Sequence, residues 1–366
     1  MQKFYDLNMI LAHKPWRIEQ EDFQRLTRGE DSWSLSEVIH GIILLVHFHS
    51  LTTYFYGCEI NESLRRNRNN CCEMENHLAS SRPGSRLSLL ISDDESSSLD
   101  TSPERSPDRA TDLENELMHS SVEIIDKEIR RKLSTPDDIP PDQLVKLEAL
   151  RKKMEQLRRS SADSDELAER FSKIKEQSCE LLIAPKQENL LLNTDIGLFI
   201  DKPDFTYEDF FCERNCKGSP TFRVQDYSWE EQGSSLVYSL ASAELGSLLS
   251  DKFKIAQTMT YRTLGKHKNV DTTSLREAIW NYAQCLFGIR YDDYDYNVVN
   301  QLLERDLKAF IKTAVCYPER LSSDVYTIVM QNLHESEKIH VLLMLMEARM
   351  QAELLYALRA LKQFMT

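Results

Sequence analysis

The sequence predicts an all-α protein in which helical regions flank a polar tract. A helix-start pattern precedes the apolar run 38–46, and the stretch after residue 226 is helical in character throughout. Glycine and proline are rare in that stretch and fall at the expected breaks between helices. Nothing in the sequence requires a strand. With 366 residues the chain is long enough for two or three domains.

Residues 1–60 should form a helical subdomain. Ser34 and Glu37 form the S-x-x-E pattern of a capping box, in which each side chain satisfies a backbone N–H group at the start of a helix. The apolar run that follows predicts a helix over residues 35–56, and Pro15 marks an earlier break.

Residues 61–112 are dominated by Ser, Asn, Arg, Asp and Pro. Because few apolar side chains are available to offset the entropy lost on ordering, we expect a disordered linker. Ser102 and Ser106 each precede a proline and suit a proline-directed kinase, although an ordinary Ser/Pro-rich linker explains them better.

Residues 113–183 should form a helical linker, with helices near 113–133 and 142–159. In the second of these, Leu147, Leu150, Met154 and Leu157 recur at spacings of three and four and make a narrow apolar seam. The seam covers too few heptads for an independent coiled coil, so we expect it to pack against a domain.

Residues 184–366 should form the C-terminal all-α domain. Its first part, 184–224, is irregular and aromatic, and we expect it to lie as a strap on a helical body. The expected helices are near 228–241, 243–264, 273–288, 295–316, 322–333 and 335–365. The last helix is apolar on most sides, which predicts the centre of a bundle.

Charge and composition exclude several classes of partner. A net charge of −14 repels phosphate backbones and anionic membrane surfaces, so we expect no nucleic acid and no membrane insertion. The longest apolar runs, 42–46 and 341–346, fall far short of the ~20 residues that span a bilayer. No secretory signal is evident, and the eight cysteines show no framework spacing. We therefore expect reduced thiols in the cytosol or also the nucleus. We also expect a monomer.

Catalytic and cofactor motifs are missing from the sequence. It holds no Gly-rich phosphate loop, no nucleophile elbow and no H-E-x-x-H zinc motif, so we expect no cofactor. His47 and His49 lie two residues apart, about 200° around a helix, and cannot share a metal ion. Cys285 lies in an expected helix with no neighbouring base, cation or second cysteine, which favours an apolar filler over a redox residue.

Three polar clusters stand out in the C-terminal domain. They are the threonine-rich segment 260–263 with Thr272, then Arg276, and then Glu337 with His340. From the residues alone, helix capping explains the hydroxyl side chains better than a binding site does.

Several stretches resemble the sestrin family, and this resemblance favours a binding site over helix capping for these polar residues. They are residues 11–16, 33–35, 280–282 with Cys285, 287–296, 299–305, 316–319 and 347–360. The resemblance implies two related all-α halves similar to the alkylhydroperoxidase AhpD fold, joined by a helical linker. It also implies a stress-inducible leucine sensor that acts on the GATOR complex, which controls the target-of-rapamycin (TOR) kinase, during amino-acid starvation and in the response to reactive oxygen species.

The resemblance also implies a leucine site. In it, Arg276 would hold the leucine carboxylate and Glu337 the ammonium group, while the threonines would close over the ligand. The implied residues are Thr260, Tyr261, Thr263, Thr272, Leu275, Arg276, Met330, Leu333, Glu337 and His340. Because Met330 and Leu333 are aliphatic where the best-defined vertebrate sestrins carry aromatic residues, we expect leucine binding that is retained but weaker.

Asp292 and Asp293 correspond to the family's GATOR-contacting pair, and the alternative is a solvated acidic helix start. The family's reactive cysteine lies upstream of what corresponds to Met1, so we expect no peroxide reductase activity and a truncated N-terminal half. Two alternatives stay open: an alkylhydroperoxidase-type oxidoreductase, and an adaptor whose pocket is vestigial.

Overall fold

The computed structural model describes residues 3–29, 32–58, 141–157, 163–179, 181, 210, 221–321 and 329–366. The predicted disordered linker with its two candidate kinase sites and the predicted helix 113–133 lie outside the described residues. So do most of the strap 184–224 and most of the predicted helix 322–333.

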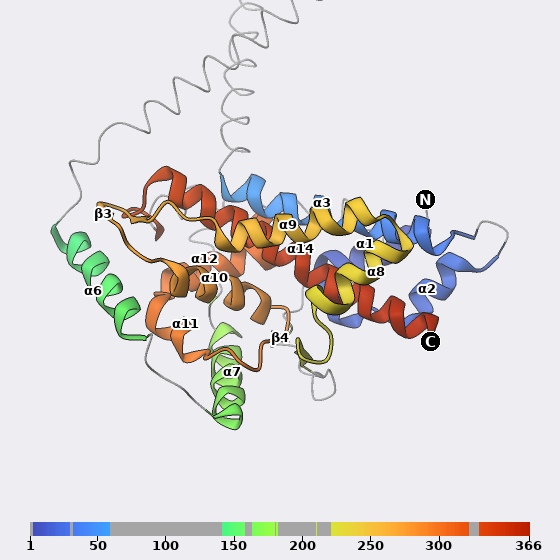
Figure 1. Ribbon diagram of the computed structural model, residues 1–366, viewed down its shortest axis with the longest axis horizontal. Coiled ribbons are helices and arrows are strands. Elements are labelled where there is room, and N and C mark those ends of the chain that lie inside the picture. The colour runs from blue at the N-terminus through green and yellow to red at the C-terminus, as the bar shows by residue number, and fades with distance from the viewer. Residues whose placement is uncertain are drawn as a thin grey trace, which may run out of the picture. The chain divides into compact units, whose positions relative to one another are not determined.

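Helix α14 (Glu335–Met365) is the centre of the described fold, as the sequence predicts. Its side chains are buried on nearly every side from Val341 to Leu361. A helix of this kind must be covered all round, and it packs against α3 (Leu35–Gly57), α9 (Ala243–Thr258) and α10 (Thr273–Cys285) (Figure 1).

The N-terminal helices share the core of α14. They are α1 (Lys3–His13), the 3-10 turn Pro15–Arg17, α2 (Gln20–Thr27) and α3. The predicted capping box begins α3: the Ser34 N–H donates to Glu37 Oε2 at 2.8 Å, and the Glu37 N–H donates to Ser34 Oγ at 3.3 Å. The predicted helix over residues 35–56 is thereby confirmed.

A buried charged network ties these helices to α14. Arg349 donates to Glu353 at 2.8 Å, to Thr53 at 3.3 Å and to the Ala12 carbonyl at 3.1 Å. Glu353, which is fully buried, also shares a 2.7 Å hydrogen bond with His49 Nδ1. Partners on three helices therefore stabilise two charges that would be costly to bury alone.

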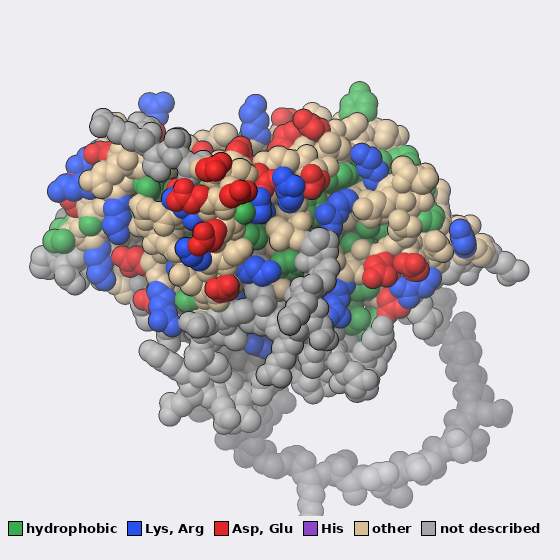
Figure 2. All heavy atoms as spheres, turned by 90° about the horizontal axis from the view of Figure 1, so that it is seen from below, with side chains coloured by type: hydrophobic (Ala, Val, Ile, Leu, Met, Phe, Trp, Pro, Cys, Tyr) green, Lys and Arg blue, Asp and Glu red, His purple; other side chains and the backbone are tan. Residues whose placement is uncertain are grey.

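Helix α3 is, among the described helices, the one long and apolar enough to cross a membrane by length and composition. One face of it packs along α14, while Leu44 and Phe48 on another face are exposed (Figure 1). On the face turned to the viewer in Figure 2, acidic and basic side chains are interspersed and apolar ones are scattered.

The remaining helices complete an all-α architecture, which confirms the predicted fold class. They are α6 (Pro141–Leu157), α7 (Ser164–Cys179), the π-turn Trp229–Gly233, α8 (Ser234–Leu240), α11 (Asn297–Leu302), α12 (Arg305–Cys316) and the 3-10 turn Pro318–Arg320. The α6 seam is buried at Leu147 and Met154 and packs against α10 and α11, as its spacing predicts.

Two short strand pairs accompany the helices, although nothing in the sequence requires a strand. Two-residue strands pair as β1 (Phe222–Arg223) with β4 (Ile289–Arg290) in parallel, and as β2 (Thr263–Leu264) with β3 (His267–Lys268) antiparallel.

Two predicted helices are interrupted. The predicted helix 243–264 ends at Thr258, because a hairpin follows in which Arg262, Gly265 and Asn269 adopt positive φ angles. The predicted helix 295–316 is split at Leu303, whose backbone is extended.

The described rings of the aromatic strap dock on the helical body, as expected. Phe210 is buried and lies edge-on to Trp16 with ring centroids 5.3 Å apart. Phe222 is buried edge-on against Tyr356 at 4.9 Å, with the Arg359 guanidinium 4.0 Å from the centre of its ring.

The buried network gives a stability prediction. Arg349→Met leaves Glu353 without its guanidinium partner in the core, so the free energy of unfolding should fall by about 3–5 kcal/mol. Urea unfolding measures this. The control is Lys173→Met, which breaks an exposed pair with Glu169 and should change stability by less than ~1 kcal/mol. Equal effects of the two substitutions would contradict the importance of the network.

Candidate functional site

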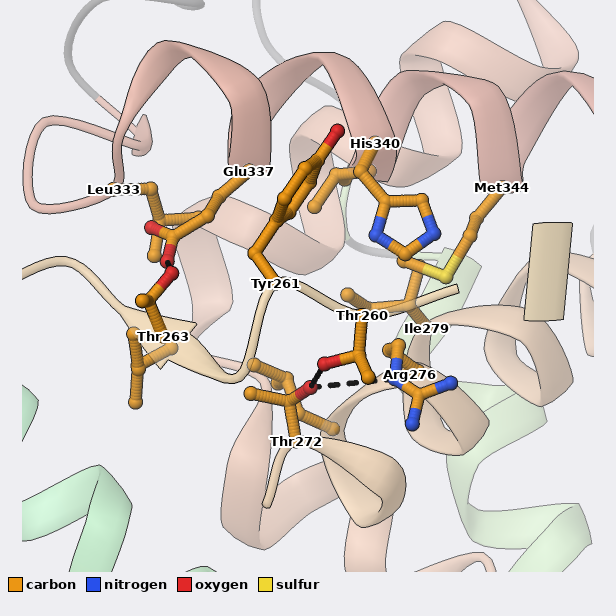
Figure 3. Close-up of a pocket in the computed structure, with 13 residues that line it drawn as sticks. Thr260, Tyr261, Thr263, Thr272, Arg276, Ile279, Leu333, Glu337, His340 and Met344 are labelled. Atoms are coloured by element: carbon orange, nitrogen blue, oxygen red, sulfur yellow. Dashed lines mark hydrogen bonds between the residues drawn. The ribbon is translucent and has the colours of Figure 1, made fainter. Parts of the chain in front are cut away.

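One pocket of the described structure lies where the β2–β3 hairpin, the start of α10 and the start of α14 meet (Figure 3). Its cavity has a volume of about 40 Å³, room for a few water molecules. The lining residues are Thr260, Tyr261, Thr263, Leu264, Thr272, Leu275, Arg276, Ile279, Leu333, Glu337, His340, Val341 and Met344.

Every residue of the expected leucine site lines this pocket except Met330. Met330 is buried but does not line the cavity, because the chain turns there and presents Leu333 instead. Sequence reasoning missed Leu264, Ile279, Val341 and Met344. The helical period could have found three of these, since Ile279 follows Leu275 by one turn, and Val341 and Met344 follow Glu337 by one and two turns.

The side chain of Glu337 is surrounded by hydrogen-bond donors from two segments of the chain. Its oxygens accept from the Thr263 hydroxyl at 2.5 Å, from the Gly265 N–H at 2.9 Å and from the His334 N–H at 2.8 Å. The last of these belongs to a capping box that begins α14. The same side chain therefore starts the central helix, fastens the hairpin and forms one end of the pocket.

Arg276 lies at the other end of the pocket in Figure 3. It donates to the Gln257 carbonyl, to Thr272 Oγ1 at 3.3 Å and to Thr273 Oγ1 at 3.1 Å. These acceptors are uncharged, and within the described ranges no carboxylate lies within ion-pairing distance of the guanidinium. Burial lowers the pKa of Arg276, although a guanidinium remains charged at neutral pH.

Hydroxyl and aromatic groups close the rim of the pocket. Thr260 Oγ1 and Thr272 Oγ1 lie 3.3 Å apart in a hydrogen bond that joins the two ends of the hairpin segment. The Tyr261 ring stands edge-on to His340, with centroids 6.1 Å apart, and is about half exposed. Burial lowers the pKa of His340, so the ring is neutral at neutral pH and its Nε2–H donates to the Ala256 carbonyl at 3.0 Å.

The pocket thus has a guanidinium near one end, a carboxylate at the other and an apolar wall between them. Leu275, Ile279 and Met344 supply much of that wall. Such an arrangement can bind a small molecule that carries an anionic group, a cationic group and an apolar side chain.

Comparison with known proteins agrees with the sequence resemblance. A family model described as "PA26 p53-induced protein (sestrin)" matches residues 1–365. Sestrin-1 of Xenopus laevis is 40% identical over 366 residues, which cover 99% of this chain and 67% of the relative. The chain belongs to the sestrin family. Sestrin-2 of Homo sapiens is 39% identical over 374 residues (100% and 68% covered), and the Sestrin homolog of Drosophila melanogaster is 38% identical over 390 residues (100% and 77% covered).

The acidic pair of this sestrin-family chain lies outside the pocket, on the turn after β4. Asp292 is ion-paired with Arg223 at 2.7 Å and with Arg290, and its side chain is only 9% exposed. Asp293 is exposed. The solvated helix start that the sequence left open therefore does not describe Asp292, which joins the two strands β1 and β4.

The thiol of Cys285 is unreactive in this environment. It is fully buried, and burial raises the pKa of its thiol far above the ordinary range. Because the thiolate is the nucleophile, a thiol in this state is inert. Cys285 is the apolar filler that its helical position predicts.

Thiol labelling tests this view of Cys285. In the native protein at pH 8, an alkylating reagent should modify Cys58, which is partly exposed, and leave Cys285 unmodified. In denaturant both should react at the same rate. Peptide mass spectrometry reads the two sites separately, and native labelling of Cys285 at the rate of Cys58 would contradict the assignment.

Proposed function

We propose that this sestrin-family chain is a receptor for free leucine that regulates the TOR kinase through the GATOR complex, in response to amino-acid starvation and reactive oxygen species. One observation carries the proposal: Arg276 and Glu337, from separate segments, line the same pocket with apolar side chains between them. Free leucine is a zwitterion with a branched apolar side chain, and it needs those three features together.

Each end of leucine has a matching group. The planar guanidinium of Arg276 suits a carboxylate, which it can grip with two N–H groups. The carboxylate of Glu337 suits the ammonium group. The apolar side chain would lie against Leu275, Ile279 and Met344, where its burial is worth about 1.5–3 kcal/mol.

The hydrogen bonds that Glu337 already makes bear on affinity. Its carboxylate accepts from Thr263 and Gly265 of the hairpin segment over residues 260–268, and an ammonium group must compete with these donors. The free energy of the hydrogen bonds lost is subtracted from binding. Leu333 adds an aliphatic wall that is less pre-organised than a ring. Both effects favour leucine binding that is retained but weak.

We propose a non-catalytic chain. The burial of Cys285 argues against an oxidoreductase built on the thiol of the C-terminal region. An adaptor with a vestigial pocket differs from a receptor in one measurable property, because a ligand that binds only the folded state must raise the melting temperature.

The proposal extends to domain organisation, oligomeric state and localisation. Residues 1–60 and 184–366 would be two related halves of the AhpD type, joined by the linker regions 61–112 and 113–183. The chain would act as a monomer in the cytosol and also in the nucleus.

A thermal-shift series with amino acids tests the proposed receptor. Leucine at a hundred times its dissociation constant should stabilise the fold by about 2.7 kcal/mol and raise the melting temperature by a few degrees. Isoleucine and methionine should act more weakly, and glutamate not at all, because the wall of the pocket is apolar. No shift with millimolar leucine would favour the vestigial adaptor.

Substitutions at the two ends of the pocket test the assigned roles. Arg276→Lys keeps the charge but loses the planar fork, and Glu337→Gln removes the partner of the ammonium group. Each should weaken leucine binding by about 10-fold or more in calorimetry. Glu335→Gln, two residues from Glu337 on α14, serves as the matched control and should bind like the unchanged chain.

The acidic turn makes a separate prediction for the partner. Asp293→Asn should weaken capture of the GATOR complex without changing the melting temperature, because Asp293 is exposed. Asp292→Asn should lower both the capture of the GATOR complex and the melting temperature, because Arg223 and Arg290 lose their shared carboxylate. Normal capture by Asp293→Asn would remove Asp293 from the interface.

A further inference from the structure

The segment 252–270 is strongly basic, although the chain as a whole has a net charge of −14. It holds five Lys or Arg residues and one His, and it contains no Asp or Glu. Three of the cations, Arg262, Lys266 and Lys268, belong to the β2–β3 hairpin or directly precede it, and all three are exposed. We call these three residues the basic hairpin. A cluster of one sign on an otherwise acidic protein creates a local positive potential.

The cations of the basic hairpin have no ion-pair partner among the residues that the structure describes. The carboxylates of neighbouring elements have other partners. Glu335 is paired with Lys338 at 2.7 Å, and Asp271 accepts from the Thr273 N–H at 3.0 Å at the start of α10. Glu337 is buried and accepts hydrogen bonds from the hairpin itself. The positive charge of the basic hairpin is therefore directed to solvent.

Helix α6 extends the positive surface where it meets the hairpin (Figure 1). The Glu148 carboxylate lies 2.8 Å from Arg151 Nη2 and 3.6 Å from His267 Nε2. The hydrogen bond from Arg151, together with the nearby His267 and Lys152, holds the pKa of this carboxyl below its usual range. Glu155, the other carboxylate on this side, is also paired with Arg151, at 3.3 Å. With Arg151 and Lys152, five Lys or Arg residues surround this junction against two carboxylates.

The spacing of the hairpin cations suits an extended chain. Thr263 is paired with Lys268 across the two strands, which places Lys266 at the turn. Arg262 and Lys266 are separated by four residues of extended backbone, roughly 13 Å at about 3.3 Å per residue. An extended acidic peptide presents carboxylates on one side about every 7 Å. Two or three of these carboxylates can therefore meet the cations at the same time.

The acidic remainder of the molecule favours a narrow partner. An anionic membrane surface or a nucleic-acid duplex carries charge over a wide area and would also approach the acidic parts of the chain. A short acidic segment interacts mainly with the local cations, because charges more than ~8 Å away are largely screened at physiological salt. The basic hairpin therefore attracts an acidic protein segment more strongly than it attracts a membrane or a nucleic acid.

We propose that the basic hairpin and residues 148–152 of α6 form a docking surface for an acidic, extended segment of a partner protein. This surface is distinct from the acidic turn that carries Asp293, which has the opposite charge. The inference goes beyond the proposed receptor function and does not depend on it, because docking needs no leucine in the pocket.

Fluorescence anisotropy of the full chain with a labelled peptide tests the surface. The probe is a short peptide in which Glu and Ser alternate, and the control probe carries Gln in place of Glu. The Glu peptide should bind and the Gln peptide should not. Raising the salt concentration from about 50 mM to about 300 mM should weaken binding by about fivefold or more, because the charges are exposed. Equal binding of the two peptides would overturn the proposal.

Charge reversal locates the binding surface. Lys266→Glu and Lys268→Glu should each weaken binding of the Glu peptide by about fivefold or more, because repulsion replaces attraction. Lys173→Glu, at an exposed position on α7, changes the net charge equally and is the matched control. Its affinity should stay within about twofold of the unchanged chain. Equal losses in all three variants would show an effect of net charge alone and contradict a local surface.

A milder variant keeps the test valid if charge reversal disturbs the fold. Lys268→Ser removes one cation without adding repulsion, and it should cause a smaller loss of affinity in the same direction. Circular dichroism verifies that each variant folds. Affinity for the Glu peptide that is unchanged in folded Lys268→Ser and folded Lys266→Glu would remove the hairpin from the surface.

Covalent coupling and vesicles complete the test. A carbodiimide joins a bound carboxylate to a lysine amine, so peptide mass spectrometry should find the Glu peptide on Lys266 and Lys268 and not on Lys173. Coupling at Lys173 alone would contradict the assignment. Vesicles of phosphatidylserine and phosphatidylcholine should not retain the chain. Retention that Lys266→Glu abolishes would identify a lipid surface as the partner and overturn the acidic protein segment.

Discussion

The described fold depends on the complete enclosure of α14. This helix is buried on nearly every side, so each of its faces needs a partner, and helices from both ends of the chain supply them. α3 covers it from the N-terminal region, while α9 and α10 cover it from the C-terminal region. The pocket lies where this enclosure ends, at the first turns of α14, beneath a hairpin rather than a helix.

The charges inside α14 follow from the same enclosure. Glu347 is paired with Lys252 at 3.1 Å, and Arg349 and Glu353 are paired with each other and with groups on α1 and α3. Buried pairs of this kind add little net stability compared with apolar residues, but they penalise any misplacement of a partner helix. They therefore favour the faces of α3 and α9 that meet α14.

Periodicity and capping rules predicted most of the helices, because those depend on neighbours within one turn. The capping box at Ser34 and the apolar run of α14 are local patterns of this kind. The β2–β3 hairpin could not be predicted in the same way. Its segment reads as a continuation of α9, whereas in the structure Thr263 and Gly265 contact Glu337, more than 70 residues away. Tertiary contacts of this range leave no local pattern.

For the site residues, too, local sequence patterns were not sufficient. The threonines, Arg276 and Glu337 came from the family resemblance, and composition alone had favoured helix capping. Both interpretations apply to Glu337, which caps α14 and also lines the pocket. Met330 does not line the described cavity, because its position depends on how the chain turns before α14, which no periodic pattern describes.

Glu337 links the pocket to the fold, because the same carboxylate lines the cavity and begins the central helix. A carboxylate that contacted only a ligand would not connect ligand binding to the rest of the fold. This one also accepts hydrogen bonds from the hairpin and from the first turn of the central helix. Under the proposed receptor function, a ligand that competes for it would exchange one set of hydrogen bonds for another, which lowers its net affinity.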